Sequence, residues 1–170
     1  MLQNFTSTRS PEELLAEADS LAVLRFHQST DATQSLTDTR VELLGEAGDS
    51  YEVWKAEGAQ VEHGSEGNCA WARTNNLQFT AITAPLADGD DFEATAYAVY
   101  QELLSVIENC PHPELVRFWN YIPNINHGAG DSENYKRFCT GRLRAYSEHN
   151  LQDLQFPAAS AVGHYGLSLI

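Results

Sequence analysis

The sequence has few of the features that mark secreted, metal-binding or membrane-spanning proteins. It contains only three cysteines, Cys69, Cys110 and Cys139, and none of them forms a Cys-x-x-Cys pair. An odd and sparse set of this kind favours reduced thiols, so we expect a cytoplasmic protein. No apolar run approaches the ~18 residues of a transmembrane helix, and the start of the chain lacks the apolar core of a signal peptide. The sequence therefore predicts no membrane association.

Positive charge is also scarce. Ten Lys and Arg stand against 24 Asp and Glu, which gives a formal net charge of −14. Because a nucleic-acid site needs a basic surface, this balance argues against a nucleic-acid partner. The six histidines show no H-x-x-x-H spacing, and the sequence has neither a phosphate-binding glycine loop nor a G-x-S-x-G nucleophile elbow. We therefore expect no metal and no cofactor.

What the sequence does contain is strand alternation interrupted by two stretches of helical periodicity. A first helix is expected from the carboxylate-rich segment at residues 88–93 to residue 110, and a second from residue 131 or 132 to about 149. The carboxylates at 88–93 suit the positive end of a helix, although those at 88–91 could also bind a cation. Strands are expected at residues 21–27, 41–44, 51–55, 60–63, 69–73, 77–83, 115–122, 156–164 and 167–170.

Turn signals indicate how the early strands pair. A Glu-Gly-Ala turn predicts a hairpin between residues 51–55 and 60–63, and an Asn-Asn turn predicts pairing of 69–73 with 77–83. The early strands are thus expected to be antiparallel. The element order predicts an α+β domain with two helices on one face of a mixed sheet. We expect one domain at residues 21–170 after a lead-in segment at residues 1–20, which is either a short helix started by Pro11 or loosely ordered.

Three segments carry a family resemblance: R-F-W-N-Y-I-P-N-I-N at residues 117–126, N-Y-K-R-F-C-T-G-R at 134–142 and P-A-A-S-A-V-G at 157–163. Together they resemble the N-terminal half of the chorismatase family, which includes 3-hydroxybenzoate synthases. The resemblance implies a RidA (YjgF) fold, which is also called chorismate-mutase-like. It also implies that related domains continue the last strand beyond Ile170, so the last strand should be short here. The family's catalytic residues lie in a second half, so none is assigned to this chain.

The resemblance also bears on three possible activities. RidA-type imine deaminases hold the substrate carboxylate with an arginine in a P-A-R-S motif, and Ala159 occupies that position here. Because a methyl group cannot bind a carboxylate, imine deamination is not expected. The RidA-family activity of endoribonuclease or translation inhibitor is disfavoured by the charge of −14. Conversion of chorismate is expected only if a second half exists or if subunits build a site together.

The candidate site lies on the strand predicted at residues 115–122. Alternation places Arg117, Trp119 and Tyr121 on one face of this strand. An arginine beside two aromatic rings suits an anionic ring compound such as chorismate or a hydroxybenzoate. The alternative is an interface arginine that binds carbonyl groups or a carboxylate, with both aromatics packed in a core. The resemblance implies that this face meets another domain, so we expect either a homotrimer or a second RidA-like domain as partner, and a structural or ligand-binding role in aromatic-acid metabolism.

Overall fold

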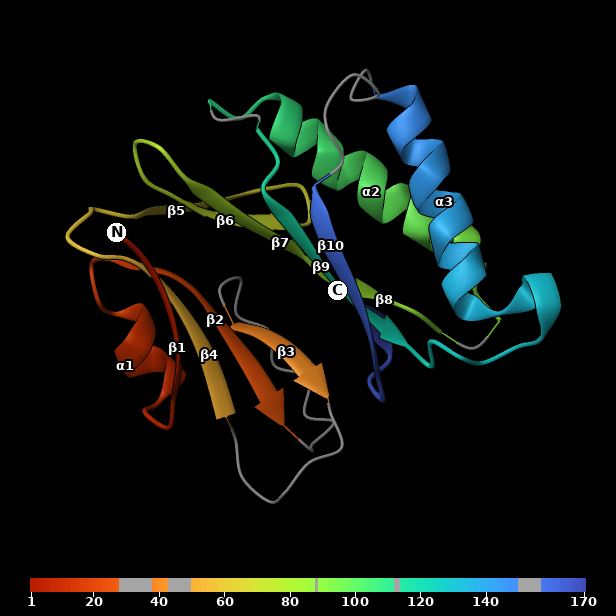
Figure 1. The fold of residues 1–170 in the computed structure, drawn as a ribbon, viewed down its shortest axis with the longest axis horizontal. Helices are drawn as coiled ribbons and strands as arrows, with labels where there is room; N and C mark the ends of the chain where they lie inside the picture. The colour runs from red at the N-terminus through yellow and green to blue at the C-terminus, as the bar shows by residue number, and fades with distance from the viewer. Residues whose placement is uncertain (28–37, 43–49, 88, 112–113, 150–156) are drawn as a thin grey trace. The chain divides into compact units, whose positions relative to one another are not determined.

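The computed structural model divides the chain into two compact units, Met1–Ala81 and Ile82–Ile170 (Figure 1). The residues that it describes are 1–27, 38–42, 50–87, 89–111, 114–149 and 157–170. Three parts of the predicted elements lie outside these residues: positions 43–44, Asp88 and position 156. The domain boundary expected at residue 20 stays a prediction.

The first unit contains a four-stranded sheet with the order β1-β4-β2-β3. Its strands are β1 (Leu2–Ser7), β2 (Ser20–His27), β3 (Asp38–Glu42) and β4 (Ser50–Ala56). Strand β4 is antiparallel to both of its neighbours, whereas β2 and β3 run parallel. The expectation that the early strands are all antiparallel is therefore wrong for β2 and β3. The strand β1 was not predicted at all, because its polar residues show no apolar alternation.

Helix α1 (Pro11–Leu15) follows β1 and is the short helix that the sequence left as one of two alternatives. The Ser10 hydroxyl caps it by accepting a hydrogen bond from the Glu13 backbone N–H at 3.2 Å. The fully buried Leu14 packs with Val23 and Val53 of the sheet. These contacts anchor the start of the chain to the sheet.

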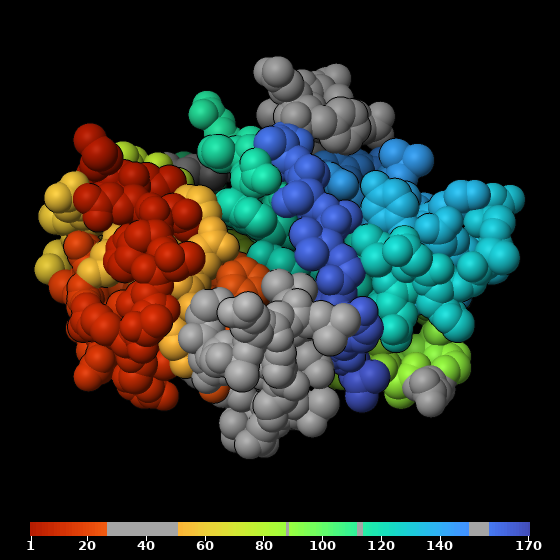
Figure 2. Space-filling view, turned by 60° about the horizontal axis from the view of Figure 1, so that its bottom comes forward, coloured from red at the N-terminus to blue at the C-terminus, as the bar shows by residue number. Residues whose placement is uncertain are grey.

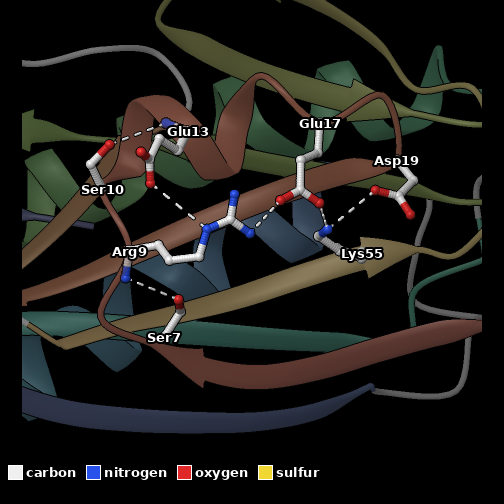
Figure 3. Close-up of polar contacts among 7 residues, drawn as sticks. All are labelled: Ser7, Arg9, Ser10, Glu13, Glu17, Asp19 and Lys55. Carbon is white, nitrogen blue, oxygen red and sulfur yellow. Dashed lines mark hydrogen bonds and ion pairs between the residues drawn. The ribbon is translucent and has the colours of Figure 1, made fainter.

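A charge network joins the segment around α1 to strand β4 (Figure 3). The Lys55 ammonium forms ion pairs with Glu17 and Asp19, and the Arg9 guanidinium lies 2.6 Å from the other Glu17 oxygen. The Lys55 side chain is only 12% exposed, so its charge needs these carboxylates as partners. Each charge of the network is thus matched locally, and we assign the network a structural role.

The second sheet of this unit has the order β5-β6-β7. Its strands are β5 (Glu62–Glu66), β6 (Cys69–Arg73) and β7 (Gln78–Ile82), and β5 pairs with β6 in antiparallel register. The predicted pairing of β6 with β7 is confirmed. The predicted hairpin between residues 51–55 and 60–63 is wrong, because β4 already has β1 and β2 on its two edges. No edge of β4 is left for the next strand.

The described residues of the second unit form two long helices and four strands: β8 (Ala84–Pro85), α2 (Phe92–Glu108), β9 (Arg117–Pro123), the 3-10 turn η1 (Gly130–Ser132), α3 (Asn134–Glu148), β10 (Ala158–His164) and β11 (Ser168–Leu169). Strands β9 and β10 are parallel, whereas β8 and β11 are antiparallel. Reciprocal backbone hydrogen bonds of 2.8 and 3.1 Å between Tyr121 and Ile170 link the two pairs. Strands β10 and β9 form one two-stranded sheet and β11 and β8 form another, and these bonds connect the two sheets.

Both long helices lie against the same face of β9. The Tyr100 ring of α2 has its centroid 5.7 Å from that of Phe118, and Tyr146 of α3 has its centroid 6.4 Å from the same ring. The helices also approach each other closely at Gly141, where an added Cβ would lie 2.3 Å from the Glu93 carbonyl oxygen. The second unit therefore has the expected two helices on one face of β9, whereas its strands form two small sheets instead of the one mixed sheet expected.

The predicted helix starts are close to those observed. The Asp91 carboxylate accepts hydrogen bonds from the backbone N–H groups of Glu93 and Ala94, which favours the capping interpretation of this acidic segment. Helix α3 begins slightly later than predicted, because residues 130–132 form η1 and Glu133 is extended.

Candidate functional site

The two faces of β9 have opposite environments. Phe118, Asn120 and Ile122 are buried, with exposed fractions of 7%, 6% and 0%. On the other face the exposed fraction falls along the strand, because Arg117 is exposed, Trp119 is half-buried and Tyr121 is buried. The three predicted site residues therefore do lie on one face, as the alternation of the strand requires.

Arg117 lies at the exposed end of this row. Its guanidinium carbon is 5.3 Å from the centroid of the Trp119 ring, within the range of a cation–π contact. Its Nη2 atom donates a hydrogen bond of 3.5 Å to the hydroxyl oxygen of Ser160. Among the described residues, Arg117 forms no ion pair with a carboxylate. This is the chemical feature on which a binding role depends.

Ser160 is the site residue that sequence reasoning missed. The parallel register places Ser160 of β10 beside Trp119, and Val162 beside Tyr121. Figure 2 shows β10 in blue on the surface of the second unit. Six of its seven residues are at least partly exposed, and no charged side chain lies between Ala158 and Gly163. The sequence did contain Ser160, as the last residue of the P-A-A-S segment. Only the pairing of β10 with β9 shows that the Ser160 hydroxyl lies next to Arg117.

A buried polar chain fixes Ser160 from the opposite side of the sheet. The Tyr100 hydroxyl donates to the Asn120 side-chain oxygen at 2.5 Å, and the Asn120 amide nitrogen donates to the Ser160 carbonyl oxygen at 3.0 Å. Burial raises the pKa of Tyr100, so its hydroxyl stays protonated and keeps donating. Asn120, a polar exception in an apolar strand, thus connects α2 with both parallel strands.

Tyr121 contributes packing to this face. Its side chain is 6% exposed, and its backbone holds Ile170 after the short strand β11. The open part of the candidate site is therefore formed by Arg117, Trp119 and Ser160, with Val162, which is 41% exposed, next along β10. Aromatic, cationic and hydroxyl groups converge there within one patch of the two parallel strands.

Other residues of the second unit are explained by packing. The Arg142 guanidinium lies between 5.4 and 5.8 Å from the ring centroids of Tyr100, Phe118 and Tyr146. Burial raises the pKa of Tyr146, although the positive charge of the nearby Arg142 opposes this shift. Arg142 therefore packs over the aromatic side chains of the core, which gives it a structural role.

Three further expectations concern the imine deaminase arginine, a metal site and a membrane-spanning helix. Ala159 lies in β10 beside Phe118, with a methyl group at the position where the resemblance places a substrate-binding arginine. In the part of the chain that the structure describes, no group of three or more His, Cys, Asp or Glu side chains could hold a metal ion. Likewise, none of the described helices is both long and apolar enough to cross a membrane.

The comparisons with known proteins agree on one family. Residues 52–170 match the family described as chorismatase FkbO/Hyg5-like, N-terminal. A chorismatase of Streptomyces rapamycinicus is 32% identical over 142 residues, which cover 82% of this chain and 42% of that protein. A 3-hydroxybenzoate synthase of Streptomyces hygroscopicus is 34% identical over 116 residues, which cover 68% of this chain and 33% of that protein.

The fold has a counterpart among solved structures. A crystal structure of a chorismatase superimposes with a TM-score of 0.79 at 24% sequence identity, and the match covers 99% of this chain and 52% of that one. The chain therefore spans about half the length of this structure and less than half of the two relatives above.

Proposed function

The chain belongs to the chorismatase FkbO/Hyg5-like N-terminal family, and from this premise we propose that it binds a small aromatic carboxylic acid on the face formed by β9 and β10. The observation that carries the proposal is the Arg117 guanidinium, which is exposed, lies 5.3 Å from the Trp119 ring and forms no carboxylate ion pair among the described residues. A cation beside an indole suits a ligand that has both a carboxylate and a ring.

The names of the relatives support this ligand class. Chorismate and 3-hydroxybenzoate, to which the relatives' names refer, are ring compounds that carry carboxylates. The charge of −14 makes nonspecific capture of anions unfavourable. A site that binds such a ligand must therefore supply a local positive charge, and Arg117 is the exposed cation of this face.

The proposed context is a RidA-like domain that packs against another one. The two helices α2 and α3, which both pack on one face of β9, support this context. Because related proteins are about twice as long, the partner is either a second RidA-like half or further copies of this chain in a trimer. The proposed role of the domain is structural as well as ligand-binding, without a catalytic residue of its own.

Isothermal titration calorimetry tests the binding proposal directly. We expect chorismate and 3-hydroxybenzoate to release or absorb heat in a saturable manner at millimolar concentration, and we expect the Arg117→Met variant to lose that signal. An isotherm for the unaltered protein with no heat beyond dilution at millimolar ligand would refute the binding role. Light scattering on the same sample would show whether the chain is a monomer or the proposed trimer.

The alternative function is an enzyme that converts chorismate at subunit interfaces. The relatives named chorismatase favour this alternative. It requires that a partner supply the acid or base, because the exposed face of β9 and β10 offers a guanidinium, an indole and a hydroxyl only. Pyruvate release from chorismate separates the two functions: steady release requires turnover, whereas stoichiometric binding without release supports the role we favour.

A further inference from the structure

We propose that Ser160 is a second ligand-binding residue, which holds the carboxylate together with Arg117 and thereby selects aromatic acids over neutral aromatics. The inference deepens the proposed function and rests on it. It assigns a role to a hydroxyl that only the pairing of β9 with β10 brings to the guanidinium.

The separation of the two groups suits a shared anion. Arg117 Nη2 and Ser160 Oγ are 3.5 Å apart, which is longer than the ~2.8 Å of a strong hydrogen bond. A carboxylate oxygen can therefore lie about 2.8 Å from both atoms at once, where it accepts one hydrogen bond from each. Because the Ser160 oxygen already accepts from Arg117, its own hydrogen is left to donate to the anion.

The Ser160 backbone is held in place before any ligand arrives. Asn120 donates to its carbonyl oxygen at 3.0 Å, and the Tyr100 hydroxyl holds the Asn120 side chain in the orientation that makes this possible. Both residues are buried, with exposed fractions of 6% for Asn120 and 2% for Tyr100. A site supported in this way loses little entropy on binding, since its frame is already ordered.

The neighbours of the pair define the remaining part of the ligand. Trp119 lies beside Ser160, and the partly exposed Val162 follows along β10. An aromatic ring attached to the carboxylate can cover these apolar side chains, whereas a small aliphatic acid leaves them in water. The ligand class is therefore an aromatic monocarboxylate with the size of a benzoate.

Calorimetry with 3-hydroxybenzoate and with its neutral analogue 3-hydroxybenzyl alcohol tests this assignment. We expect Ser160→Ala to weaken binding of the acid about tenfold, since a hydrogen bond to a charged group is lost, and to leave the alcohol unchanged. Arg117→Met should weaken the acid at least as much. The matched controls Ser105→Ala and Arg144→Met alter exposed residues of α2 and α3 and should bind the acid like the unaltered protein.

The possible outcomes separate this inference from the function on which it rests. If Ser160→Ala binds the acid within twofold of the unaltered protein while Arg117→Met does not, the role of Ser160 is overturned and the Arg117 site stands. If Ser160→Ala weakens binding of the acid and of the alcohol by the same factor, the role is also overturned, because a general change in the strand would affect both ligands equally. If the unaltered protein binds no acid, both proposals fail together.

Discussion

The buried pair of Tyr100 and Asn120 gives the sharpest test of how the site is built. Replacing Asn120 with Leu keeps the branching and the number of side-chain heavy atoms but removes both of its hydrogen bonds. The Tyr100 hydroxyl then stays buried without its acceptor, which costs about 2 kcal/mol, and the lost bond to the Ser160 carbonyl adds about 1 kcal/mol. We therefore expect Asn120→Leu to lower the free energy of unfolding by about 3 kcal/mol.

The second half of the test removes the orphaned hydroxyl. Tyr100→Phe alone should cost about 1.5 kcal/mol, because the Asn120 oxygen loses its donor. The double variant Tyr100→Phe/Asn120→Leu should be more stable than Asn120→Leu alone, since it no longer leaves the Tyr100 hydroxyl buried without an acceptor. Urea denaturation of the three variants measures these differences, and each 1 kcal/mol should also shift the melting temperature by about 2–4 °C.

Additive losses would refute this reasoning. If the double variant is as unstable as the sum of the two single variants, Tyr100 and Asn120 do not act as a pair, and the support of Ser160 from the helix side is lost as an argument. The matched control is Tyr97→Phe, which removes another hydroxyl of α2 that donates at 2.5 Å to Glu148. Because that bond is exposed, the control should change stability by much less than Tyr100→Phe.

Two further predictions concern the helix pair of the second unit. Gly141→Ala should destabilise the protein by about 1–3 kcal/mol in urea denaturation, because the new Cβ would lie 2.3 Å from the Glu93 carbonyl oxygen; an unchanged midpoint would contradict the close approach of α2 and α3. Stability should also fall in acid: hydrogen bonds from the Ala94 N–H and the Tyr97 hydroxyl lower the pKa values of Asp91 and Glu148. The two carboxylates stabilise the fold fully above their ordinary pKa values of 3.8 and 4.5, and this stabilisation is lost as the pH falls through their lowered pKa values. Asp91→Asn should therefore make the melting temperature depend less on pH at the acid end of a melting series.

Much of the local structure followed from the sequence. Ser10 and Asp91 are side chains that cap helices, and each lies at the N-terminus of an observed helix. The alternation around Arg117 and Trp119 correctly divided β9 into two faces, because the side-chain period of a strand is two whatever it pairs with. These features depend on neighbours within a few residues, which is why a single sequence reveals them.

Pairing between distant segments was decided by the tertiary structure alone. The sequence pattern gave no reason for β2 and β3 to run parallel, or for β4 to pair with β1 instead of β5. The site shows the same division: Arg117 and Trp119 could be named from their own strand, but Ser160 is 43 residues away from Arg117 and meets it only through the register of β9 with β10. Strand alternation is a local property of the backbone, whereas strand partners are selected by the burial and hydrogen bonding of the whole unit, and no short stretch of sequence contains that information.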